Sequence, residues 1–136
     1  MLDHYTFTKA SEIMSDAEQH LSILFNRPVY VRFDFLNTSL SPDLIINIVA
    51  ASCGITPFQL RSKEKKDDFA VARYHCFNLM YRLLSMTKSE IGRQFDRGHD
   101  TVIHGLKMFD TMYDTYPQFK AKNIEIEREI LKALSL

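Results

Sequence analysis

The strongest constraint on the fold of this chain is a break between two helical patterns within residues 86–107, MTKSEIGRQFDRGHDTVIHGLK. Thr87, followed three residues later by Glu90, forms a capping-box pattern that opens a short helix ending near Phe95. Gly98 is expected to supply a left-handed turn residue, because glycine adopts positive φ without steric cost. The pattern therefore predicts a short helix followed by a tight turn.

A second helix is predicted after this turn, opening at His99 or Asp100 and running to about Thr115. A short helix, a turn of about four residues and a longer helix describe a helix-turn-helix, in which the first residues of the second helix face the major groove of DNA. Side chains that can bond base edges or phosphates gather here: Arg93, Arg97, His99, Asp100, Thr101, His104 and Lys107.

The net charge of zero conceals an uneven distribution along the chain. Residues 1–59 carry three basic and six acidic side chains, residues 60–107 carry ten and six, and residues 108–136 carry four and five. A basic middle segment between two acidic ends favours a localised anionic partner over general attraction to anions. Because the bias is modest, the charge alone does not identify that partner as nucleic acid.

Helical periodicity and cap signals predict further helices on both sides of the break. Residues 41–54 begin with Ser-Pro and end with Gly, as a capped helix does, and residues 55–60 read as a short turn of helix. After an exposed basic loop, Asp67 or Asp68 is expected to cap a long helix. Pro117 is expected to start a final helix.

The first forty residues have a different pattern. Thr8 or Ser11 is expected to cap a helix that stops near residues 26–27. Pro28–Phe35, PVYVRFDF, alternates apolar and polar side chains as a half-buried strand does. Because a lone strand leaves its backbone groups unpaired, it must pair with His4–Phe7 or with the same strand of a second copy. The second arrangement predicts a homodimer held by residues 1–40.

These elements predict a mainly α fold. Residues 1–40 would form a small N-terminal α/β arm, and residues 41–136 a helix-turn-helix domain with a C-terminal helix.

Three stretches between about Leu44 and Met112 form a distinctive series: Gly54–Thr56, the basic Ser62–Lys66, and the helix-turn-helix pattern of residues 86–105. In these stretches, about half of the chain, the sequence resembles the C-terminal, double-strand-binding domain of the bacterial replication initiator DnaA. The resemblance implies a Trp-repressor-like helix-turn-helix that binds double-stranded DNA.

The resemblance also implies roles for the matching residues. The family's minor-groove arginine falls on Lys65, and its phosphate-contacting arginine early in the long helix falls on Arg73. The base-reading histidine falls on His99, and a threonine that contacts the DNA backbone falls on Thr101.

Other family phosphate contacts match Thr87 and His104, and Lys63 and Lys66 would approach one groove or its phosphates. The complete set expected at the DNA is Lys63, Lys65, Lys66, Arg73, Thr87, Lys88, Arg97, His99, Asp100, Thr101 and His104.

The chain departs from the family pattern at the positions that read bases. One glycine is missing between Phe95 and Arg97, the family's base-reading aspartate is Gly98, and its first threonine is Asp100. Two acidic residues at 67–68 also stand where the family loop is basic. Asp100 near the groove would favour a cytosine amino group and repel phosphate, so the target sequence should differ from the family's usual box.

Several other site classes find no support in the sequence. Cys53 and Cys76 lie among apolar neighbours without a partner at zinc-ligand spacing, and His99 and His104 are five residues apart rather than three or four. No G-x-x-x-x-G-K-[ST] motif is present, so no nucleotide is expected to bind. No metal or other cofactor is expected.

The remaining expectations concern location and activity. No run of about 18 apolar residues predicts a membrane span, and the first residues lack the pattern of a secretion signal, so a cytoplasmic location is expected. No nucleophile–base pair is visible, so we expect no enzyme. The main prediction is a sequence-specific DNA-binding protein connected with replication initiation or its regulation, and the alternative is a protein-interaction module that kept the fold but lost DNA binding.

Overall fold

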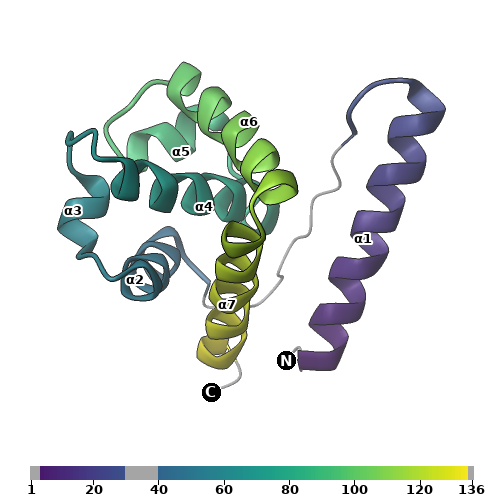
Figure 1. Ribbon diagram of the computed structural model, residues 1–136, viewed down its shortest axis with the longest axis horizontal. Coiled ribbons are helices and arrows are strands. Elements are labelled where there is room, and N and C mark those ends of the chain that lie inside the picture. The colour runs from purple at the N-terminus through teal and green to yellow at the C-terminus, as the bar shows by residue number, and fades with distance from the viewer. Residues whose placement is uncertain (1–3, 30–39, 135–136) are drawn as a thin grey trace.

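Figure 1 shows the computed structural model, which describes residues 4–29 and 40–134. These residues form seven helices and no strand: α1 (His4–Phe25), α2 (Pro42–Cys53), α3 (Pro57–Arg61), α4 (Asp67–Leu83), α5 (Lys88–Gln94), α6 (His99–Thr115) and α7 (Pro117–Leu134). The prediction of a mainly α helix-turn-helix fold is confirmed.

The N-terminal helix α1 starts earlier than the caps predicted at Thr8 or Ser11. His4–Phe7, suggested as a strand partner, is the first part of this helix, so that suggestion is wrong. These residues contain no proline or glycine to stop a helix from extending backward. The predicted strand Pro28–Phe35 lies mostly outside the described residues.

The ends of α2 and α3 follow their sequence signals. The Ser41 hydroxyl accepts a hydrogen bond from the Leu44 amide at 3.2 Å, and Gly54 ends α2 in the left-handed conformation with φ 69°. Such caps satisfy backbone groups that the helix itself leaves unpaired. Thr56 caps α3 through a capping box with Gln59.

The start of α4 differs from the prediction. Lys66, rather than either aspartate, occupies the N-cap position and makes no side-chain cap bond. Asp67 and Asp68 lie in the first turn. Their negative charges are favourable there because the helix dipole is positive at its N-terminal end.

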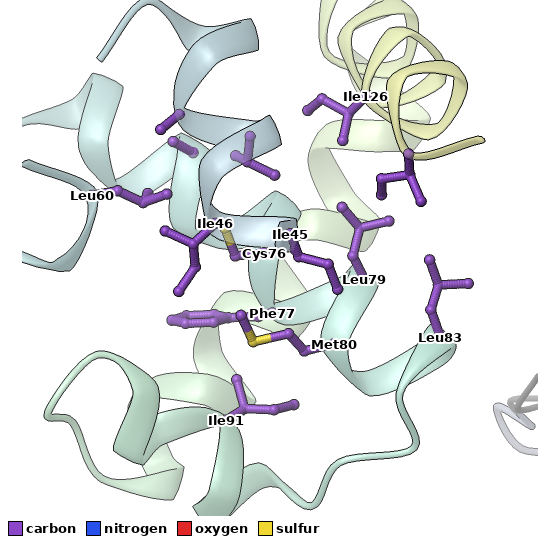
Figure 2. Close-up of a cluster of buried hydrophobic side chains, with 14 of the residues drawn as sticks. Ile45, Ile46, Leu60, Cys76, Phe77, Leu79, Met80, Leu83, Ile91 and Ile126 are labelled. Carbon is purple, nitrogen blue, oxygen red and sulfur yellow. The ribbon is translucent and has the colours of Figure 1, made fainter. Parts of the chain in front are cut away.

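The core lies where α2, α4 and α7 meet the short helices, and Figure 2 shows its central side chains. Ile45 and Ile46 of α2, Phe77 of α4 and Ile126 of α7 are each at most 1% exposed. Each such side chain contributes about 1.5–3 kcal/mol by leaving water. Phe95, the residue that ends α5, packs edge-on against Phe77 at 5.2 Å between ring centroids, which anchors the helix-turn-helix to this core.

α6 approaches α4 closely because a glycine lies at the contact. A Cβ atom added at Gly105 would lie 2.4 Å from a ring carbon of Phe77 and 3.2 Å from one of Tyr74. Any larger residue would push α6 away from α4. Gly105 therefore fixes how the second helix of the helix-turn-helix sits on the core.

Figure 1 shows α1 beside the other helices, next to α7. Met14 is buried, but the helix also exposes large apolar side chains, among them Ile23 at 80% and Leu24 at 74%. α1 thus carries apolar surface that the rest of the described chain does not cover.

Candidate nucleic-acid interface

The first helix of the motif, α5, begins at a complete capping box. The Thr87 hydroxyl accepts from the Glu90 amide at 3.1 Å, and the Glu90 carboxylate accepts from the Thr87 amide at 3.2 Å. These hydrogen bonds hold the pKa of Glu90 below its usual value. The predicted capping box is therefore confirmed, and it fixes where α5 starts.

One carbonyl of α5 accepts two hydrogen bonds from the turn that follows the helix. The Gly92 carbonyl accepts from the amides of Phe95 at 3.0 Å and Arg97 at 2.9 Å. A Cβ at Gly92 would lie 2.4 Å from the Arg97 carbonyl oxygen, so only glycine allows the chain to fold back this tightly.

The left-handed residue of this turn is Asp96, with φ 52°, and not Gly98, whose φ is −77°. The prediction for Gly98 was therefore wrong. Asp96 tolerates this conformation better than most residues because a short polar side chain can bond locally. The sequence does mark this position, because an aspartate follows Phe95 where the family pattern has a glycine.

The second helix, α6, begins without a side-chain cap. Gly98 is the N-cap and supplies no side-chain hydrogen bond. Unpaired amides at a helix N-terminus attract anions such as phosphate. His99, Asp100 and Thr101 follow, all three exposed, and the His99 Nε2 lies 3.3 Å from an Asp100 carboxylate oxygen.

Arg73 occupies a different kind of place from the phosphate contact expected of it. It is only 5% exposed. Its guanidinium donates to four carbonyl oxygens. Two belong to α3, those of Gln59 and Leu60 at 3.4 and 2.8 Å, and two to the loop that follows, those of Ser62 and Glu64 at 2.6 and 3.0 Å. Burial, and next the nearby charge of Arg97, lower the pKa of Arg73, although arginine stays charged in proteins. Arg73 therefore holds the basic loop in shape.

The basic loop, residues 62–66, is tied directly to the turn. The Ser62 carbonyl that binds Arg73 also accepts from Arg97 at 2.8 Å, and Arg97 donates a second bond to the Phe95 carbonyl at 3.0 Å. The Lys63 ammonium donates to the Asp96 carbonyl at 2.6 Å and lies 3.2 Å from its carboxylate. The structure thus brings Lys63 and Arg97 together.

The other predicted contacts lie around this frame. Lys65 and Lys66 are exposed on the loop, and the Lys66 ammonium lies 5.6 Å from the centroid of the Phe69 ring. Lys88 opens α5 with its ammonium 5.8 Å from the Tyr81 ring. His104 is exposed and lies one turn along α6 from the reading residues.

The sequence analysis did not identify Ser62, the residue that joins the basic loop to the turn after α5. Ser62 acts through its backbone carbonyl, which any residue type carries, so no side-chain pattern could have identified it. The contact became visible only when the fold placed residues 62 and 97 side by side.

α5, the turn and α6 define the class of this protein as a helix-turn-helix protein. Residues 42–108 match the family model of the bacterial DnaA protein helix-turn-helix, and this part of the chain belongs to that family.

Curated relatives match the same part of the chain. It is 38% identical over 69 residues to the chromosomal replication initiator protein DnaA of Leptospira biflexa, a match that covers 51% of this chain and 16% of the relative. The initiators of Desulfotalea psychrophila and Oleidesulfovibrio alaskensis are 32% and 31% identical, over 53% and 49% of this chain and 15% and 14% of theirs. The match therefore spans about one-sixth of the relatives' length.

Two features are absent from residues 4–29 and 40–134. No helix there is long and apolar enough to cross a membrane. No group of three or more His, Cys, Asp or Glu side chains is arranged to hold a metal ion.

Proposed function

We propose that this chain binds double-stranded DNA in a sequence-specific manner through α5, α6 and the basic loop. The observation that carries the proposal is the shared Ser62 carbonyl, which accepts from both Arg73 and Arg97. Through it, the loop that would track one groove and the helix that would enter the next form one rigid surface. A preorganised surface loses less conformational entropy on binding.

The proposed contacts divide by chemistry. His99, Asp100 and Thr101, on the first turn of α6, would read base edges in the major groove. Lys65 and Lys66 would meet the adjacent groove or its phosphates. Arg73, with its guanidinium committed to backbone carbonyls, would act by positioning the loop rather than by touching DNA.

Further phosphate contacts would come from the rim of the motif: Thr87, Lys88 and His104. Lys63 and Arg97 would add positive charge to the loop and the turn. Phosphate contacts of this kind fix orientation on the duplex without selecting a sequence.

The relatives are named as chromosomal replication initiators, and this similarity supports the proposal that the chain acts in replication initiation or its regulation. The proposed activity is binding without catalysis.

Mobility-shift titration on random duplex DNA at two salt concentrations tests the proposal. Each phosphate contact should add about −0.9 to the slope of log affinity against log salt. Lys65→Ala should reduce the slope by about one contact, whereas Lys132→Ala at the far end of α7 should leave it unchanged. A shallow slope in the unmodified protein would reject DNA binding.

The second candidate is a protein-interaction module that kept the fold. Two observations favour it: the exposed acidic side chains of Asp67, Asp68 and Asp100 and the exposed apolar side chains of α1. Failure of the DNA titration together with a folded, cooperatively melting protein would favour this candidate.

We also propose that residues 1–40 act as a dimerisation arm, since α1 exposes apolar side chains that a second copy would cover. Two helix-turn-helix units could then engage two half-sites.

A further inference from the structure

A cavity opens between α4, α5 and α6, beside the helix-turn-helix. Its volume is about 180 Å³, close to the roughly 150 Å³ of engineered cavities that bind a benzene ring. Tyr81 of α4 and Ile103 and Leu106 of α6 give it apolar walls. The cavity is therefore of the size and surface chemistry to hold one small ring.

The lining of this cavity carries more positive than negative side chains. Arg82 from α4, Lys88 from α5 and Lys107 from α6 line it, against one acidic side chain, Asp110. Three cations from three helices around an apolar interior attract a ligand with an apolar body and a negative group.

Two buried polar atoms at the cavity lack partners. Asn78 is only 7% exposed, and its Oδ1 has no hydrogen-bond partner; the same holds for the Nε–H of Arg82. A buried polar atom without a partner is unfavourable because it has lost its hydrogen bonds to water. A bound molecule that reached these atoms with one donor and one acceptor would satisfy both.

A neighbouring hollow shows the opposite charge. It shares Asn78, Arg82 and Asp110 with the cavity, and half of its other lining residues are acidic: Glu18, Asp114 and Glu127. An anion is repelled on that side, so the negative group of a ligand must face Lys88 and Lys107.

We propose that the cavity between α4, α5 and α6 binds a small aromatic carboxylate that carries an N–H or O–H donor. The ring lies against Ile103 and Leu106, the donor meets the Asn78 carbonyl, and the carboxylate meets Lys88 and Lys107.

Such a ligand would also change DNA binding, a consequence that rests on the proposed function. Lys88 belongs both to the cavity wall and to the proposed phosphate contacts. A carboxylate held there neutralises its charge and repels phosphate, so the ligand would weaken DNA binding.

The test is an amide-resolved NMR titration of the full chain with 3-hydroxybenzoate in the absence of DNA. We expect 3-hydroxybenzoate to cause saturable chemical-shift changes at residues that line the cavity. The changes should be smaller with benzoate, which lacks the donor, and absent with 3-hydroxybenzylamine, which is cationic. Lys107→Ala should weaken binding about tenfold, as loss of one charge-assisted contact does. Lys132→Ala, a surface lysine on α7, is the matched control.

A second variant, Ile103→Trp, fills the cavity and should abolish the shifts. No saturable shift at millimolar 3-hydroxybenzoate overturns the proposal. A Lys107→Ala variant that binds the ligand as well as the unmodified chain also overturns it. The same holds for chemical-shift changes that spread over the basic loop and vanish in Lys63→Ala. Because the titration contains no DNA, ligand binding with no DNA binding would reject the proposed function and leave this site intact.

Discussion

At the scale of the single residue, Gly92 and Gly98 near the turn differ in whether the fold leaves space for a side chain. A Cβ at Gly92 would collide with the Arg97 carbonyl at 2.4 Å, whereas a Cβ at Gly98 would meet nothing within 4 Å. Gly98 also has a φ of −77°, which any residue adopts. Only the first glycine is therefore required by the fold.

Gly92→Ala should consequently lower the free energy of unfolding by about 1–3 kcal/mol, because the turn must open to admit the methyl group. Gly98→Ala should change it by less than about 0.5 kcal/mol. Urea unfolding of the two variants measures both effects. Equal stabilities would show that the turn closes differently from the arrangement described above.

His75 is a second residue whose environment has a measurable consequence. It is fully buried, stacks on Phe119 at 4.1 Å between ring centroids, and pairs its Nδ1 with the Asn123 side-chain oxygen at 3.0 Å. Its Nε2 is buried without a partner. Burial above all lowers the pKa of His75 to about 4, so the ring is neutral in the folded protein near neutral pH.

Because the pKa is lowered in the folded state, the unfolded chain binds the proton more readily. The contribution of His75 to the free energy of unfolding is fully present above the pKa of about 6.5 in the unfolded chain. It is lost as the pH falls from there toward 4, by about 3 kcal/mol in total. Urea unfolding between pH 7 and 4.5 measures the slope. His75→Phe keeps the stacking ring and removes the titration, so its slope should be shallower.

Glu127, whose pKa burial raises, titrates in both proteins, so the difference between their slopes isolates His75. Identical slopes would place the acid sensitivity elsewhere.

Nothing in the sequence distinguished His75 from a partly exposed polar residue. The long helix that carries His75 was predicted, but the burial of His75 depends on α7, which packs Phe119 and Asn123 against it. Contacts between residues 75 and 123 are set by the tertiary fold and leave no local pattern.

At the scale of the element, local signals worked where the determining atoms are close in sequence. The capping box at Thr87, the Ser41 cap and the Gly54 terminator were all predicted and are confirmed. The prediction that Asp67 or Asp68 caps α4 was wrong. Lys66 occupies the N-cap position without a side-chain hydrogen bond, so no capping residue type marks it in the sequence. The prediction of a left-handed residue at Gly98 was also wrong. The left-handed residue is Asp96, which directly follows Phe95, where the family pattern has glycine.

The first turn of α6 carries the prediction for specificity. His99→Ala should lower affinity for the preferred DNA site by about 1–3 kcal/mol and flatten the preference at one base position, since a lost base contact relaxes readout there. Selection from a random duplex library measures this. His20→Ala, which removes an exposed histidine from α1, is the control and should select the same sequences as the unmodified chain.

An unchanged selection profile for His99→Ala would remove His99 from the reading surface. Uniform weakening on all sequences would instead make it a phosphate contact.

At the scale of the whole molecule, the sequence predicted the fold better than the site. Helical periodicity located α2 to α7 because each buries one face in a shared core. The ties between the basic loop and the turn join residues more than thirty positions apart, and only the assembled fold brings them into contact. The division at residue 40 stays a prediction.

The apolar surface of α1 gives the last prediction, that two copies associate through residues 1–40. Ile13, Leu24 and Phe25 are 67%, 74% and 56% exposed, and Ile13 and Leu24 lie eleven residues apart, about three turns along the same helix face. A second α1 packed on this face would bury Ile13 and Leu24, at about 1.5–3 kcal/mol for each side chain. We expect sedimentation to show a dimer at micromolar concentrations and Leu24→Glu to convert it to a monomer. Phe58→Glu alters an apolar residue on α3 that is even more exposed than Leu24, and it should leave the dimer intact. An unmodified chain that sediments as a monomer would mean that this face stays uncovered or is met by another partner.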